Sequence, residues 1–167
     1  WNTQRPELYY YEGTIWYRKR FDWTNEIDKR QFVYFGAINY DAKVYLNGEL
    51  IGEHLGGFTP FNIEVTGRLK NTNSLVVKVD NKRKPEAVPT VNADWWNFGG
   101  ITRQVSLVSV PSIFIRDYTM QLDKTNNKLI KGWIQLDGAT SGETVQVQIP
   151  ELKISARVTT DKSGFAQ

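Results

Sequence analysis

Residues 42–51 read Ala-Lys-Val-Tyr-Leu-Asn-Gly-Glu-Leu-Ile, and this stretch decides the fold class. Its first five residues alternate between two faces with the period of two that is typical of a β-strand. Asn47-Gly48 follows, and such a pair predicts a hairpin because a type I′ turn needs positive φ at both central residues. The return strand is expected to run through Leu50 and Ile51. The stretch therefore predicts an antiparallel β-hairpin.

The same period recurs along the chain, and no long segment has the period of an α-helix. Residues 61–65 and 75–79 alternate, and residues 101–107 predict a further strand. Residues 32–38 are nearly all apolar, which predicts one strand buried on both faces. Only residues 66–70 suggest a helical turn, with Thr66 as its N-cap. Short strands with turn signals every ~8–12 residues are typical of a sandwich or barrel.

Two connections depart from this rhythm. Residues 2–13 are polar and contain the run Tyr9-Tyr10-Tyr11. The segment Asn81–Gly100 has no clean periodicity and contains Asp94-Trp95-Trp96 and Gly99-Gly100. Loops of this length in compact domains are usually functional or disordered, and two adjacent tryptophans argue against disorder. We therefore expect a functional loop at residues 81–100, whose two glycines allow a tight backbone turn.

The run Val110-Pro111-Ser112 predicts a domain boundary, with one domain over residues 1–110 and another over residues 111–167. An immunoglobulin-like sandwich needs about seven strands, so we expect the second domain to be incomplete. Trp1 is not a natural start, which favours a processed or excised chain. The strands expected after the boundary lie near residues 113–115, 118–122, 129–136, 144–149 and 154–160.

Composition excludes several kinds of site. The chain has no cysteine, and hence no disulfide or thiolate chemistry. No segment approaches the ~20 consecutive apolar residues of a membrane helix. The net charge is +3, but acidic residues are spread through the same segments as the basic runs 18–20 and 82–84, which favours a solvated surface over a nucleic-acid site. No cluster has metal-ligand spacing. We predict no cofactor, no metal, no nucleic-acid partner and no membrane partner.

Four motifs together resemble a known family. They are residues 13–21 (GTIWYRKRF), residues 35–48 with the hairpin, residues 54–61 (HLGGFTPF) and residues 94–103 (DWWNFGGITR). They occur in family order over residues 9–111. Each motif is weak alone, but in register they resemble the sugar-binding domain of glycoside hydrolase family 2, in its β-galactosidase/β-glucuronidase-like branches.

The resemblance implies a jelly-roll β-sandwich over residues 1–110 and a partial immunoglobulin-like β-sandwich over residues 111–167. It also implies a (β/α)₈ barrel of about 250 residues, absent from this chain, that holds both glutamates of a retaining β-glycosidase. No catalytic residue is therefore expected in this chain. The pair Asn25-Glu26 is similar to the family's acid/base pair, but it lies in a polar turn and is assigned no catalytic role.

The same resemblance assigns substrate-binding residues to the loop. Asp94 matches an acidic residue that reaches into the barrel's pocket, where a carboxylate accepts charge-assisted hydrogen bonds from sugar hydroxyls. The alternative is that Asp94 braces its own loop. Neighbouring side chains of an extended segment point in opposite directions, so one of Trp95 and Trp96 is expected to stack on a sugar or the barrel and the other to enter the core. Asn97 is a further polar candidate.

His54 and Arg103 are assigned structural roles, His54 because it lacks a catalytic or metal partner at useful spacing and Arg103 as a paired charge in an apolar strand. The chain is thus expected to be the non-catalytic N-terminal portion of a family 2 β-glycosidase, with the barrel and a carbohydrate as partners. One alternative is an autonomous carbohydrate-binding module that uses the loop aromatics or residues 9–11. Another is a purely structural domain. Sugar specificity and localisation stay open, and a bacterial periplasmic or secreted location fits a polysaccharide-degrading parent.

Overall fold

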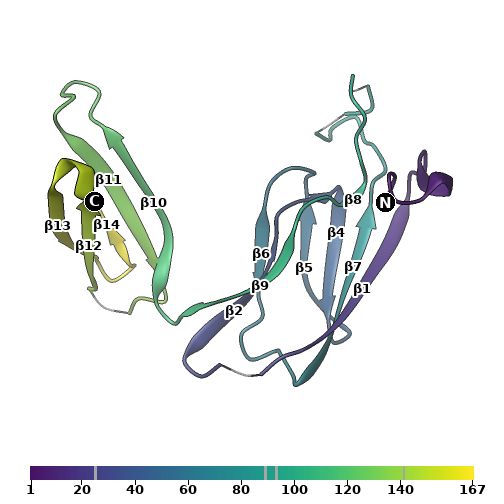
Figure 1. The fold of residues 1–167 in the computed structure, drawn as a ribbon, viewed down its shortest axis with the longest axis horizontal. Coiled ribbons are helices and arrows are strands. Elements are labelled where there is room, and N and C mark those ends of the chain that lie inside the picture. The colour runs from purple at the N-terminus through teal and green to yellow at the C-terminus, as the bar shows by residue number, and fades with distance from the viewer. Residues whose placement is uncertain (25, 89, 93, 141) are drawn as a thin grey trace. The chain divides into compact units, whose positions relative to one another are not determined.

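A computed structural model describes residues 1–24, 26–88, 90–92, 94–140 and 142–167. The chain forms two compact units, Trp1–Ser109 and Val110–Gln167 (Figure 1). The described residues form antiparallel sheets and two short 3₁₀ turns, η1 (Pro6–Leu8) and η2 (Pro150–Leu152), without an α-helix. The all-β prediction is confirmed. A search of the described residues finds no helix with the length and apolar character that crossing a membrane requires.

The described residues of the first unit form three sheets. The largest has the order β1 (Thr14–Asp22), β7 (Thr72–Asp80), β4 (Asp41–Leu46) and β5 (Glu49–Leu55). A second has the order β6 (Phe61–Glu64), β2 (Lys29–Phe35) and β9 (Val105–Pro111). A short pair joins β3 (Ile38–Asn39) to β8 (Gly100–Ile101).

The predicted hairpin is confirmed as β4–β5. Leu46 pairs with Glu49 across the turn. Both turn residues have positive φ, 53° at Asn47 and 90° at Gly48. The Asn47 side chain also accepts a hydrogen bond from the backbone N–H of Ser74 at 2.9 Å, which ties the turn to β7.

The core lies between the two larger sheets, because side chains from both of them belong to one buried cluster. Val44 of β4 and Val79 of β7 are fully buried there, and so is Phe35 of β2. Phe35 stacks on Phe61 of the neighbouring strand, with ring centroids 4.8 Å apart. Period-two alternation in the sequence thus supplies the apolar face of each sheet.

Three local predictions in this unit are wrong. Residues 32–38 do not form one strand, since β2 ends at Phe35 and the backbone N–H of Gly36 then donates to Gln104 O at 2.9 Å. Residues 101–107 are likewise divided between β8 and β9. The helical turn predicted over residues 66–70 is limited to a hydrogen-bonded turn at residues 66–68, and Thr66 is not its N-cap, because its hydroxyl accepts from the backbone N–H of Gln31.

The described residues of the second unit form a three-stranded sheet and a hairpin. The sheet has the order β10 (Phe114–Leu122), β11 (Ile130–Asp137) and β14 (Phe165–Ala166), and the hairpin joins β12 (Thr144–Ile149) to β13 (Ile154–Thr159). The predicted segments 113–115 and 118–122 form a single strand, with a bulge between Ile115 and Asp117. An apolar hollow of about 210 Å³ is lined by residues of both sheets, among them Met120 and Trp133.

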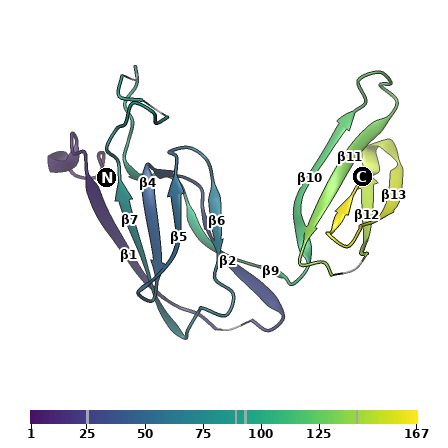
Figure 2. The same cartoon turned by 180° about the vertical axis from the view of Figure 1, so that it is seen from behind.

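One end of the first unit carries its irregular segments. The N-terminal segment and the connection from β7 to β8 lie side by side at this end in both views (Figures 1 and 2). We call residues 2–13 and 81–100 together the loop end.

Candidate functional site

Asparagine side chains hold the connection from β7 to β8 at both of its ends. Asn81 accepts a hydrogen bond from the backbone N–H of Gly13 at 2.8 Å and donates to Tyr11 O at 3.2 Å. At the far end, the backbone N–H of Gly99 donates to the Asn2 side chain at 2.8 Å. Both asparagines are buried, so these bonds are shielded from water. The loop is therefore fixed to the N-terminal segment.

Asn39 holds the connection just before Gly99. Its amide nitrogen donates to Asn97 Oδ1 at 2.9 Å and to Phe98 O at 2.7 Å. The carbonyl of Phe98 only accepts, which fixes the orientation of the Asn39 amide. Asn39 is 1% exposed, and a Cβ at Gly57 would lie 2.6 Å from its Oδ1. Glycine at position 57 thus permits this close approach.

Gly99 and Gly100 belong to the same arrangement. A Cβ at Gly99 would collide with the Asn81 side chain, and one at Gly100 would collide with the hydroxyl of Tyr17. Gly100 also has a φ of +106°. The two glycines let the backbone re-enter the sheet as β8, in line with the tight turn expected from the sequence.

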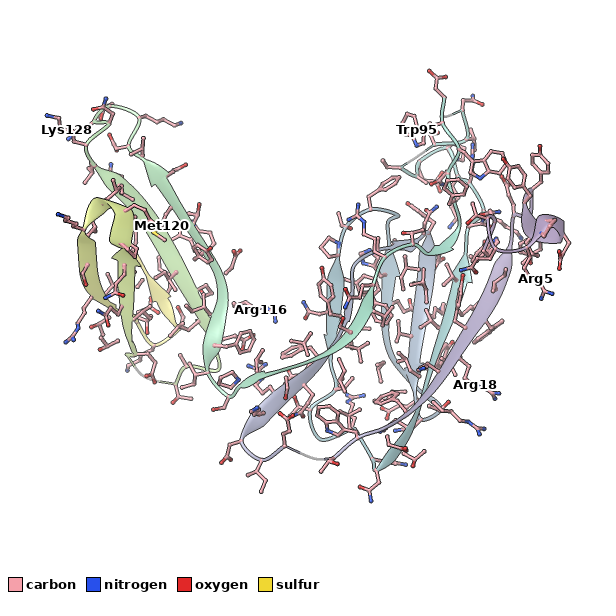
Figure 3. The ribbon with its side chains drawn as sticks, viewed as in Figure 1. Arg5, Arg18, Trp95, Arg116, Met120 and Lys128 are labelled. Carbon is pink, nitrogen blue, oxygen red and sulfur yellow. The ribbon has the colours of Figure 1, made fainter. Side chains whose placement is uncertain are left out.

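The predicted site residues lie together on the outer part of this loop. Asp94, Trp95 and Trp96 are exposed and Asn97 is half-buried. Figure 3 shows Trp95 where the loop extends beyond the strands. With the described residues, the Asp94 carboxylate makes no hydrogen bond or ion pair.

The expectation that one of the two tryptophans enters the core is wrong. Trp95 is 60% exposed and Trp96 is 39% exposed. Side chains alternate between faces only where the backbone is extended and paired, and this loop has no strand among its described residues 81–88, 90–92 and 94–99. The strands fill the core without either indole.

Trp96 is the centre of an aromatic cluster. Tyr9 stacks on it with ring centroids 4.9 Å apart and an interplanar angle of 26°. Tyr10 meets it edge-on at 5.4 Å, and Phe98 lies at 6.3 Å. Aromatic pairs at these distances attract each other beyond the area they bury. The cluster joins the N-terminal segment to the loop and leaves much of its surface open to solvent.

Two hollows flank Trp96 and Asn97, which line both. The Trp95 hollow has a volume of about 230 Å³ and is lined by Asn39, Gly57, Phe58, Trp95, Trp96, Asn97, Phe98, Thr102 and Arg103. The Tyr10 hollow has a volume of about 200 Å³ and is lined by Asn2, Tyr9, Tyr10, Tyr11, Glu12, Asn81, Arg83, Trp96 and Asn97. Both combine exposed aromatic rings with amide and charged groups, which suits a small polar ligand.

His54 and Glu26, which were assigned no catalytic role from the sequence, have structural partners. His54 stacks on Phe61 at 4.0 Å, and burial lowers its pKa. Glu26 accepts a hydrogen bond from the Ser109 hydroxyl at 2.7 Å and pairs with Lys29, and these contacts, the hydroxyl first, lower its pKa. A general acid needs a raised pKa, so Glu26 does not suit that role. Asn25 lies outside the described residues.

Arg103 departs from its prediction. It lies in the turn between β8 and β9 rather than in a strand, and its guanidinium donates to the backbone carbonyl of Phe58 at 3.4 Å. No carboxylate pairs with it among the described residues. Arg103 therefore brings a positive charge to the Trp95 hollow.

Sequence reasoning missed the buried asparagines and most of the polar residues in the hollows. Asn39 directly follows the apolar run 32–38. A polar residue beside such a run could have indicated a buried polar side chain. The proximity of Glu12 to Arg83 could not be predicted from the sequence, because only folding brings residues 2–13 and 81–100 together. Among the described residues, no three His, Asp or Glu side chains are placed to hold a metal ion.

The arrangement defines a class of protein: an all-β unit that displays aromatic rings, amides and charges at one end. Residues 2–111 match the family described as glycosyl hydrolases family 2, sugar binding domain, and the chain belongs to this family. It corresponds to the N-terminal sugar-binding domain of family 2 glycosidases.

Relatives with curated names are much longer. The chain is 34% identical over 137 residues to a β-galactosidase of Thermoanaerobacter pseudethanolicus. The aligned region covers 77% of the chain and 18% of that relative. It is 36% identical over 114 residues to a β-glucuronidase of Formosa agariphila, and this aligned region covers 63% of the chain and 12% of that relative. A solved β-glucuronidase of an uncultured Clostridium sp. has 26% identity and a TM-score of 0.77, over 92% of the chain and 29% of that structure. The chain spans less than a third of each.

Proposed function

We propose that this chain is the non-catalytic N-terminal portion of a retaining family 2 β-glycosidase of the β-galactosidase/β-glucuronidase type. Residues 1–110 form its jelly-roll domain, and residues 111–167 form part of an immunoglobulin-like domain. The family match over residues 2–111 and the small share of each relative that the chain spans support this assignment.

The observation that carries the proposal is the exposure of Asp94, Trp95 and Trp96 on a loop whose two ends are fixed. A fixed base gives the exposed side chains a defined position, which recognition of a ligand requires. A side chain that braced its own loop would be enclosed and hydrogen-bonded. Asp94 is exposed instead, which favours a partner outside the described residues.

In this proposal the chain binds substrate but does not cleave it. Retaining glycosidases need two carboxyl groups about 5–5.5 Å apart, one as acid/base and one as nucleophile. The (β/α)₈ barrel supplies both. Asp94 accepts hydrogen bonds from sugar hydroxyls at the edge of the barrel's pocket, Trp95 or Trp96 stacks on the sugar or the barrel, and Asn97 adds a polar contact.

An activity assay tests this division of labour. The isolated 167-residue chain should release no nitrophenol from nitrophenyl β-galactoside or β-glucuronide, because it lacks the barrel's carboxylate pair. Turnover that follows the purified chain through successive columns would overturn the proposal, and its loss in Glu26→Gln would assign the catalytic carboxylate to Glu26.

A second candidate function is autonomous carbohydrate binding. The specific observation in its favour is the group of exposed rings at the loop end, where Tyr10 is 79% exposed. The two functions differ in what the chain does alone, since an autonomous module binds saturably without the barrel.

A further inference from the structure

The Tyr10 hollow lies beside the residues assigned to the barrel's pocket and is lined mostly by different ones. Its walls come from the N-terminal segment, the start of the loop and the Trp96–Asn97 region. These segments are fixed by the buried amides of Asn2 and Asn81. The hollow is therefore a preformed feature of the first unit.

Aromatic rings make up part of the lining of the hollow. Tyr9 stacks on Trp96 with ring centroids 4.9 Å apart. Tyr10 contacts Tyr9 at 4.8 Å and Trp96 at 5.4 Å, both edge-to-face, and 79% of Tyr10 is exposed. Most of its ring is thus held in place and yet open to a ligand. A flat apolar surface of this kind accepts the C–H face of another ring.

Two charged side chains, Glu12 and Arg83, also line the hollow. Arg83 lies 3.8 Å from Glu12, beyond the length of a good hydrogen bond, and its Nη1 donates to Val91 O at 3.5 Å. The guanidinium and the carboxylate thus keep strong donors and acceptors for a ligand. Together they carry no net charge, which favours a neutral ligand with several hydroxyl groups.

The volume limits the ligand to one small ring. Pockets for drug-sized ligands measure about 300–1,000 Å³, whereas this hollow measures about 200 Å³.

We propose that the Tyr10 hollow is a binding site for a single neutral hexopyranose ring. The ring stacks on Tyr10, and its vicinal hydroxyls donate to Glu12 and accept from Arg83. This site deepens the second proposed function. It does not require Asp94 or the barrel.

The test is a titration of the 167-residue chain with methyl β-D-glucopyranoside and with methyl β-D-galactopyranoside. Binding is measured from the changes in NMR chemical shifts. At least one of them should bind saturably with one site and a Kd of about 1 mM, the affinity typical of so small a ligand. Tyr10→Ala should weaken binding at least ~10-fold, and so should Arg83→Gln, which removes charged hydrogen bonds. Tyr118→Ala removes another exposed tyrosine ring, from β10, and should leave Kd unchanged.

Three results would overturn the assignment: no saturable shift for either sugar, binding that Tyr10→Ala and Arg83→Gln leave intact, or tighter binding of methyl β-D-glucuronide than of the neutral sugars. Amide spectra of each variant show whether it is folded. If Tyr10→Ala does not fold, Arg83→Gln alone tests the site. A failure here leaves the role of Asp94 in a longer enzyme untouched, since that role is measured by hydrolysis.

Discussion

In the first unit, the buried ring of Phe35 and the exposed rings of the loop end have opposite roles. Phe35 of β2 is fully buried and stacks on Phe61, so its ring stabilises the fold. Trp95 and Tyr10 are mostly exposed. Burial of a large apolar side chain contributes roughly 1.5–3 kcal/mol to folding, and an exposed ring contributes little of this. Exposed aromatic rings gathered at one end therefore indicate a surface for ligands or another domain.

The largest effect should come from the strands. Phe35→Ala leaves a cavity in the core and should lower the free energy of unfolding by about 3–5 kcal/mol. Tyr34→Ala is the matched control, because Tyr34 is the preceding residue of β2 and lies on its exposed side. Urea unfolding of both variants measures the difference. Equal losses would contradict the assignment of the core to this face.

A smaller effect should come from the attachment of the loop. Asn81→Ala leaves the backbone N–H of Gly13 unpaired in a buried place, which should cost about 1–3 kcal/mol of stability. Asn92 lies exposed in the same loop, and Asn92→Ala should change stability by less than about 0.5 kcal/mol. If the two variants melt alike, the loop is not held by Asn81.

A pH titration tests the partnered carboxylate of Glu26. The Ser109 hydroxyl and Lys29 lower the pKa of Glu26 in the folded chain below its unfolded value of about 4.3. Its contribution to stability is therefore complete above that value and is lost as pH falls through the folded pKa. Unfolding free energies at pH 7 and pH 3 should differ less for Glu26→Gln than for the unaltered chain. An unchanged pH dependence would show that Glu26 gains nothing from Ser109.

The smallest effect should come from Trp95. Because its indole is 60% exposed and has no place in the core, Trp95→Ala should shift stability by no more than about 0.5 kcal/mol. Thermal unfolding followed by circular dichroism measures this. A loss as large as that of Asn81→Ala would mean that the indole supports the fold.

The sequence predicts the strands well because their signals are local. Alternation around Val44 and the Asn47-Gly48 turn specify β4 and β5 without reference to any distant residue. The run 32–38 misled because hydrophobicity alone does not reveal the bend at Gly36, which depends on Gln104. The loop end depends still more on distant partners, since Gly99 is held by Asn2. The positions of Trp95 and Trp96 follow from those bonds rather than from their own neighbours.

The role of Asp94 is the central claim, and the kcat/KM of its alanine variant tests it most directly. In the longer glycosidase to which we assign this chain, Asp94→Ala should lower kcat/KM by roughly 10- to 100-fold, equivalent to about 1.5–3 kcal/mol for lost charged hydrogen bonds. The melting temperature of the 167-residue chain should not change with the same substitution. An unaltered kcat/KM, or a loss that merely follows a lowered melting temperature, would contradict a substrate-facing Asp94.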